Sequence, residues 1–177
     1  MIVTETAIPD VKVFSPTVHG DERGFFMESF RASWLPDFEF VQDNHSRSLK
    51  GTLRGLHYQL NQPQGKLVRV IEGSVFDVAV DIRRSSPYFG QYVSRELTAA
   101  NKEIFWVPPG FAHGFLVTSE TAEFTYKCTA YYAPDDDRGI RWDDPELAIA
   151  WPEDTLPPLL STKDEQLPLL SDAEVYP

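Results

Sequence analysis

Alternating apolar and polar positions dominate the middle of the chain. In residues 73–83, GSVFDVAVDIR, large apolar side chains recur at every second position, which is the period of a β-strand. One face carries Phe76, Val78, Val80 and Ile82, and the other carries Asp77, Asp81 and Arg83 with Val75 and Ala79 among them. Residues 122–132, AEFTYKCTAYY, alternate in the same way, and LVRVIEG at 67–73 and GFFMESF at 24–30 are further strand-like runs.

Turn signals separate these runs. The segments NQPQG at 61–65, SSPYFG at 85–90 and VPPGFAHG at 107–114 combine Pro and Gly, which favour turns. Many short strands divided by such turns predict an antiparallel β-sandwich or barrel. Helical patterns are scarce: SWLPDF allows one short turn and STKDEQLPLL at 161–170 can begin a short helix. We expect a single domain over residues 1–177, with residues from about 145 forming a Pro-rich arm.

Composition and charge narrow the partners. The chain has 177 residues and a formal net charge of −11, which argues against nucleic acid, because phosphate backbones bind basic surfaces. No apolar stretch approaches the roughly 18 residues of a membrane span, and the first residues lack the pattern of a secretory signal. The lone Cys128 excludes an internal disulfide and fits a reducing compartment. We therefore expect a cytoplasmic protein that contacts neither nucleic acid nor membrane.

Two of the four histidines lie among glycines and bulky apolar residues. His57 and His113 are in such surroundings, where a neutral imidazole is favoured and can act as a general base, whereas His19 is more simply an ordinary polar residue. A metal-binding β-barrel of the cupin type often uses a His-x-His pair, but this chain has Gln59 where the second histidine would be. Two histidines without a nearby carboxylate make a poor metal site, so we expect no metal and no cofactor.

Several further side chains allow two interpretations each. Tyr126 shares its face with Phe124 and is either a core tyrosine or a phenol directed into a cavity. Asp164 follows Ser161 at the spacing of a helix capping box, and its carboxylate could instead orient a histidine. Lys66 opens a strand and is either solvated or a cation facing a cavity. Arg23, in DERGFF, is either a turn residue or a phosphate anchor.

Strict alternation raises a difficulty around Arg54-Gly55-Leu56-His57. It places His57 and Gln59 on one face of a strand and Arg54 on the opposite face. Both polar groups can enter one pocket only if the strand is bulged. Gly55 makes a bulge at this point plausible, because a glycine inside a strand often marks one.

Taken together, the motifs resemble the dTDP-4-dehydrorhamnose 3,5-epimerase family. The similar segments cover nearly the whole chain in the expected order: HGDERGFFMESF, QDNHSRS, GTLRGLHYQ, QGKLVRVIEGSVFDVAVDIRRSSPYFG, WVPPGFAHGF, YKCTAYYAPDDDRGIRWDDPELAI and STKD. The resemblance implies a cupin-like antiparallel jelly roll that is homodimeric and metal-independent. It also implies epimerisation at carbons 3 and 5 of dTDP-4-dehydro-6-deoxy-D-glucose, a step of dTDP-L-rhamnose biosynthesis.

The same resemblance implies roles for individual residues. His57 would be the base, Asp164 would hold its other ring nitrogen, Tyr126 would be the acid, and Lys66 would stabilise the enolate oxygen. The residues expected to bind the substrate, a dTDP-4-keto-6-deoxyhexose, are Arg23, Glu28, Gln42, Asn44, Arg54, His113, Tyr132, Asp137 and Lys163. In this family the first strands contribute to the neighbouring subunit's site, so Arg23 and Glu28 are expected to act across the dimer.

One position departs from the family pattern. The family commonly shows Glu in the P-x-x-E-R-x-I block, whereas this chain has Asp137, which keeps the charge on a side chain one methylene shorter. Three alternatives to the double epimerase are open at this stage. They are an enzyme that epimerises only carbon 3 or carbon 5, a non-catalytic sugar-nucleotide-binding cupin, and a metal-dependent cupin, the last weakened by Gln59.

Overall fold

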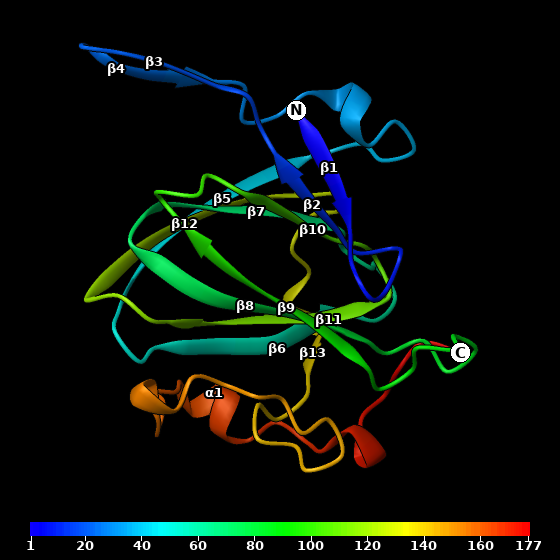
Figure 1. Ribbon diagram of the computed structural model, residues 1–177. Coiled ribbons are helices and arrows are strands. Elements are labelled where there is room, and N and C mark those ends of the chain that lie inside the picture. Colours follow the sequence, from blue (N-terminus) through cyan, green and yellow to red (C-terminus); the bar gives the residue numbers. More distant parts are fainter.

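Two antiparallel β-sheets face each other and form the body of the protein (Figure 1). The computed structural model describes residues 1–177, apart from the side chain of Asp154. In spatial order, the six-stranded sheet contains β1 (Ile2–Glu5), β2 (Lys12–Ser15), β10 (Ile104–Val107), β7 (Lys66–Glu72), β12 (Thr121–Cys128) and β5 (Gln42–Leu49). The five-stranded sheet contains β13 (Asp137–Gly139), β6 (Leu53–Gln59), β11 (Phe111–Val117), β8 (Ser74–Asp81) and β9 (Tyr92–Thr98). This arrangement confirms the predicted all-β, cupin-like antiparallel fold.

The remaining elements are short. A separate hairpin of β3 (Val18–Asp21) and β4 (Gly24–Met27) projects from the body (Figure 1). The α-helix α1 covers Thr162–Glu165, within the segment where the sequence predicts a short helix. Single 3₁₀ turns lie at Ala32–Trp34, Pro134–Asp136, Glu153–Thr155 and Leu170–Asp172.

Apolar side chains from both sheets fill the space between them. Phe115 of β11 stacks on Phe124 of β12 with ring centroids 4.3 Å apart, and Tyr126 packs against the same cluster. The predicted inward direction of Phe124 and Tyr126 is therefore confirmed. The open part of the barrel is lined by Tyr126 and by Gln42 and Lys66, the residues that begin β5 and β7.

The C-terminal segment covers the outer face of the five-stranded sheet (Figure 1). Val78 and Val80 of β8 pack with Leu147, Trp151 and Leu170 of this segment in a second apolar cluster. Both faces of β8 are thus buried, which explains why its sequence is so rich in apolar residues. The tyrosine hydroxyls of Tyr58 and Tyr176 each donate to a backbone carbonyl across this contact, so the segment also supports β6.

A bulge interrupts β6 beside Gly55, as the sequence predicts. On β11, His113 pairs with His57 and Phe115 pairs with Arg54, so the single residue between them on β11 opposes two residues of β6. Gly55 has φ +118°, and a Cβ there would lie 2.6 Å from both the Gly114 Cα and the His113 carbonyl oxygen. Directly opposed residues in a sheet share a face. The extra residue therefore puts Arg54 and His57 on the same inner face.

Candidate active site

A cavity of about 260 Å³ opens at one end of the barrel, between the two sheets. Residues from both sheets line it: β5 and β12 of one, and β6 and β13 of the other. The lining residues are Gln42, Asn44, His57, Tyr58, Gln59, Gln64, Lys66, Tyr126, Tyr132 and Asp137. Of the thirteen residues singled out in the sequence for catalysis or substrate binding, seven thus line this one pocket, namely His57 and six others.

A histidine–aspartate pair stands at the wall formed by β6. His57 Nε2 lies 2.6 Å from Asp164 Oδ1, although the two residues are 107 positions apart in the chain. Burial acts to raise the pKa of the Asp164 carboxyl, but the hydrogen bonds from His57 and Ser161 outweigh it and hold that pKa below its usual range. An ionised carboxylate can only accept, so Nε2 carries the proton and the lone pair of His57 is at Nδ1.

Both interpretations of Asp164 hold. Its backbone N–H donates to Ser161 Oγ at the start of α1, which is the predicted cap, and the Ser161 hydroxyl donates to Asp164 Oδ2 at 2.8 Å. The other carboxylate oxygen is left to accept from His57. The start of α1 therefore holds the Asp164 carboxylate in place, and this carboxylate in turn orients the His57 imidazole.

Tyr126 approaches the cavity from the opposite sheet. It lies on β12, whereas His57 lies on β6, so the phenol and the imidazole face the enclosed space from different layers. Burial is the main cause that raises the pKa of the Tyr126 hydroxyl. The phenol consequently keeps its proton at neutral pH and can donate it.

Lys66 supplies a cation to the same space. It opens β7 opposite Cys128 of β12, and this register directs it to the inner face with Tyr126. Burial lowers the pKa of the Lys66 ammonium, while the neighbouring Cys128, Asp137 and Asp77 act in the opposite direction. An ammonium in this position can stabilise negative charge that develops on a bound ligand.

Asp137 organises the rim of the cavity. Its Oδ2 accepts from the Tyr132 hydroxyl at 2.9 Å and from Lys163 Nζ. Gln42 joins the rim through its Oε1, which accepts from the Tyr132 backbone N–H at 2.9 Å, and through its Nε2, which donates to Asn44. The shorter side chain at 137 thus reaches its neighbours within the chain and anchors Tyr132 and Lys163.

Other predicted residues lie outside the cavity lining. His113 is buried behind it, where its ring is 2.8 Å from Asp77, and Arg54 donates to Ser48 Oγ at 3.1 Å. Arg23 and Glu28 lie on or just after the projecting hairpin, where they pair with Asp21 and Arg31 instead. Within one chain, the structure does not bring Arg23 or Glu28 to His57.

Gln59 is fully committed to backbone partners. Its amide nitrogen donates to the Gln62 and Tyr131 carbonyls, and its oxygen accepts from the Ala133 N–H at 2.8 Å. The residue that replaces a second histidine therefore clamps two loops beside the cavity. Among the described residues, no group of three or more His, Cys, Asp or Glu side chains could hold a metal ion.

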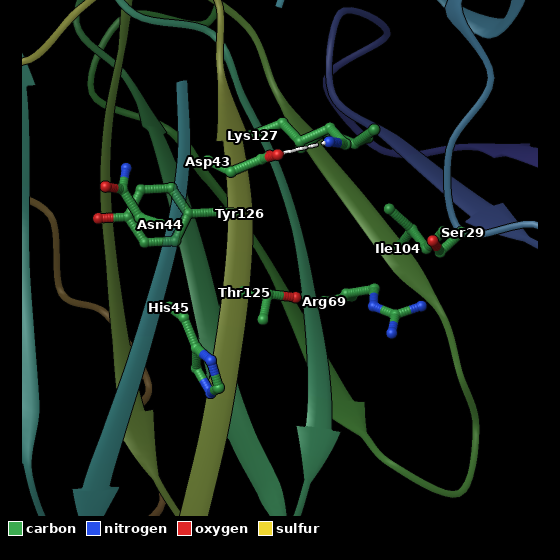
Figure 2. Close-up of a pocket in the computed structure, with 10 residues that line it drawn as sticks. Ser29, Asp43, Asn44, His45, Arg69, Ile104, Thr125, Tyr126 and Lys127 are labelled. Atoms are coloured by element: carbon green, nitrogen blue, oxygen red, sulfur yellow. Dashed lines mark hydrogen bonds and ion pairs between the residues drawn. The ribbon is translucent and has the colours of Figure 1, made fainter. Parts of the chain in front are cut away.

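A second cavity, of about 350 Å³, lies on the other side of the same strands. Figure 2 shows Asn44 and Tyr126 on one side of β12 and Lys127 and Arg69 on the other, with Lys127 paired to Asp43. The outward face also carries a histidine–carboxylate pair, His45 with Glu123 at 3.0 Å, but this imidazole is exposed to solvent. The pair of His57 with Asp164, enclosed between the sheets, is therefore the better candidate for acid–base chemistry.

Asp77 is the residue near the site that the sequence did not single out. Its carboxylate is completely buried between the sheets and faces His113 and Lys66. A signal was present, because alternation placed this charge on one face with Val75 and Ala79. A carboxylate among small apolar residues indicates a buried, paired group.

The cupin-like jelly roll thus places a histidine–aspartate pair and a phenol on facing layers of one cavity, an arrangement suited to acid–base chemistry. The model of the dTDP-4-dehydrorhamnose 3,5-epimerase family matches residues 5–172, and the chain belongs to this family. It is 56% identical over 182 residues to the dTDP-4-dehydrorhamnose 3,5-epimerase of Pseudomonas aeruginosa, with all of both chains covered. The protein is thus an epimerase, which is a kind of isomerase.

Solved structures show the same fold. One is a dTDP-6-deoxy-D-glucose-3,5-epimerase from Legionella pneumophila in complex with dTDP-4-keto-L-rhamnose, with a TM-score of 0.92 and 52% identity over 96% of this chain and 93% of that one. Another is a 3'-monoepimerase from Streptomyces bikiniensis in complex with dTDP-quinovose, with a TM-score of 0.88 and 34% identity over 94% of this chain and 87% of that one. The fold thus hosts both double and single epimerases.

Proposed function

We propose that the protein inverts carbons 3 and 5 of dTDP-4-dehydro-6-deoxy-D-glucose to give dTDP-4-dehydro-L-rhamnose, in dTDP-L-rhamnose biosynthesis. The observation that carries the proposal is the 2.6 Å His57–Asp164 pair facing Tyr126 across one cavity, in a chain of this family. No helix in the described chain is long and apolar enough to cross a membrane. The free, buried thiol of Cys128 supports the cytoplasm as the compartment.

The ketone makes the chemistry possible. A carbonyl at carbon 4 acidifies the C–H bonds at carbons 3 and 5, so His57 Nδ1 can remove either proton while the electron pair moves onto the ketone oxygen. Lys66 stabilises the resulting enolate oxygen. Tyr126 then gives its proton to the opposite face of the carbon, the carbonyl re-forms, and the centre is inverted. The proton on His57 passes to solvent and Tyr126 regains one before the second carbon reacts.

The rim and the neighbouring cations suit the rest of the substrate. Gln42, Asn44 and Tyr132 would contact the nucleotide, and Tyr132 offers a ring for stacking. Arg54 and Lys163 would bind diphosphate oxygens, with Asp137 holding Lys163 in place. His113 lies behind the lining residues, so it would support the sugar pocket through its hydrogen bond with Asp77.

Product structure tests this function directly. After incubation with dTDP-4-dehydro-6-deoxy-D-glucose, the ring proton couplings in the NMR spectrum should show inversion at both carbons, and an added chelator should change nothing. Inversion at one carbon alone would identify a single epimerase, such as the structural neighbour from Streptomyces bikiniensis. A substrate that binds but is not converted would identify a sugar-nucleotide-binding protein. Loss of turnover on addition of the chelator would identify a metal-dependent enzyme.

Tyr126→Phe should separate proton removal from proton return. The base and the cation remain, so we expect the variant to exchange the substrate's carbon 3 proton with heavy water while its rate of inversion falls about 10²-fold or more. The measurement follows the deuterium content and the configuration of the same carbon by NMR. A variant that loses exchange together with inversion would assign Tyr126 a role other than reprotonation.

We also infer a homodimer in which the β3–β4 hairpin completes the neighbouring site. Phe25 and Phe26 on this hairpin are 61% and 70% exposed, which is unusual for large aromatic side chains of one segment. Arg23 at its tip is an exposed cation that no residue of its own cavity contacts. A hairpin that packs its aromatic residues on a second copy would bring Arg23 to that copy's diphosphate site.

Subunit mixing tests this arrangement. Arg23→Ala and His57→Asn homodimers should each be nearly inactive, but random re-association at equal amounts should restore about a quarter of the wild-type activity. Half of the dimers are then mixed, and each mixed dimer has one site with both residues intact. Activity that stays at the level of the separate variants would mean that Arg23 acts in the site of its own chain. A monomeric mass by light scattering would refute the proposed dimer.

A further inference from the structure

One carboxylate oxygen of the buried Asp77 has no hydrogen-bond partner. Its Oδ1 lies 2.8 Å from His113 Nε2, but its Oδ2 has no hydrogen-bond partner. Among the described residues, this is the one buried side-chain oxygen or nitrogen left in that state. Because an unpaired buried carboxylate oxygen is costly, a nearby positive charge is needed to compensate it.

Lys66 faces the same interior and acts on Asp77 through space, without a direct ion pair among the described residues. Asp77 on β8 is opposite Phe115 of β11, and Lys66 on β7 is opposite Cys128 of β12, so both point between the sheets from facing layers. The two charges act on one another, since Asp77 favours the charged form of Lys66 and Lys66 favours the charged form of Asp77. Lys66 forms no hydrogen bond to a neighbouring acid within the described chain.

The other ionisable groups around Lys66 are either neutral or already paired. Those that act on its charge are Cys128 on β12, Asp137 on β13, Asp77 on β8 and Lys163 on α1, and His57 and Tyr126 line the same cavity. Burial raises the pKa of the Cys128 thiol, which therefore stays neutral, and Asp137 is bound by Lys163 and Tyr132. Burial raises the pKa of the Asp77 carboxyl, whereas His113 and Lys66 act to lower it, so Asp77 is the acid of this group whose charge depends on Lys66.

We propose that Asp77 is a positioning residue that keeps Lys66 charged and directed at the ketone oxygen, with His113 fixing the carboxylate from the other side. Burial strengthens the electrostatic stabilisation of the enolate, but it also disfavours the ammonium that provides this stabilisation. A buried carboxylate that touches no substrate resolves this conflict. The kinetic consequence rests on the proposed role of Lys66, whereas the pairing itself does not.

A direct titration of Lys66 tests the pairing without substrate. In protein labelled at the lysine Nζ, the Lys66 signal is assigned by its absence in Lys66→Met, and its pKa is compared between wild type and Asp77→Asn. We expect Lys66 in Asp77→Asn to lose its proton about one pH unit lower. The matched control is Asp172→Asn, an exposed aspartate that does not line the cavity, which should leave the titration unchanged.

If Asp77→Asn does not fold, the reciprocal measurement on Lys66→Met tests the same pairing. In Lys66→Met, the Asp77 carboxyl signal should titrate at a higher pH than in wild type, because the two groups stabilise each other's charges equally. The pairing would be overturned if the pKa of Lys66 were the same in Asp77→Asn as in wild type and the pKa of Asp77 were the same in Lys66→Met. This outcome would overturn it whether or not the protein proves to be an epimerase.

Kinetics test the consequence. If Lys66 acts as its ammonium, kcat of Asp77→Asn should fall about tenfold with a smaller change in KM, and the alkaline limb of its pH profile should move to lower pH together with the Lys66 titration. A purely structural role would lower the midpoint of thermal unfolding and the active fraction but leave the position of the limb where it was. That result would overturn the positioning role.

Discussion

His57→Asn should abolish epimerisation at both carbons, with kcat lower by about 10²–10⁴-fold. Asn preserves a polar side chain of similar reach but has no basic nitrogen, so neither carbon 3 nor carbon 5 can be deprotonated. Because His57 acts on the reacting carbons, the affinity for dTDP should stay close to that of wild type. Steady-state kinetics and calorimetric titration with dTDP measure the two quantities.

The exchange of substrate protons gives this prediction a second readout. A variant without the base should show no deuterium at either carbon in heavy water, in contrast to Tyr126→Phe, which should show exchange without efficient inversion. Retention of exchange in His57→Asn would mean that another group removes the proton. Loss of dTDP binding would instead mean that His57 supports the shape of the site.

Lys66→Met should be the second most damaging change, with kcat lower by about 10²–10³-fold and KM altered much less. Methionine fills a similar volume in the cavity and removes the charge that balances the enolate oxygen. The expected split follows because the negative charge on that oxygen is present in the transition state and not in the bound ketone.

The matched control is Lys50→Met, which removes an exposed lysine from the turn between β5 and β6. It should leave kcat and KM unchanged. A Lys66→Met variant that raises KM with kcat intact would show that Lys66 contributes to binding alone. In that case the enolate would have to be stabilised by another donor.

The alternation in the sequence predicted the strands and the inward direction of Tyr126, because each of these depends on local side-chain period. It also located the bulge. Regular alternation along a strand could not place Arg54 and His57 on one face, and Gly55 was the residue between them that permits a bulge. The register of β6 against β11 confirms that reasoning. These features depend on the nearest few residues, so they are visible in one sequence.

Long-range partners could not be derived in that way. Local sequence showed Asp164 as a helix cap, and only the packing of α1 against β6 brings it to His57. GFFMESF resembled an ordinary strand rich in aromatic residues, but Phe25 and Phe26 are exposed on a projecting hairpin. Whether a side chain is exposed depends on the whole assembly, which a sequence pattern does not contain. The catalytic roles themselves were expected from the family resemblance and remain predictions.

In the proposed mechanism, one base acts on both carbons of a single sugar through an enolate. The most direct measurement incubates the wild-type enzyme with dTDP-4-dehydro-6-deoxy-D-glucose in heavy water and follows carbons 3 and 5 by NMR. Both positions should lose their proton signals, and the product should carry deuterium with inverted configuration at each. Inversion that retains the original proton at either carbon, or no exchange at all, would contradict this mechanism.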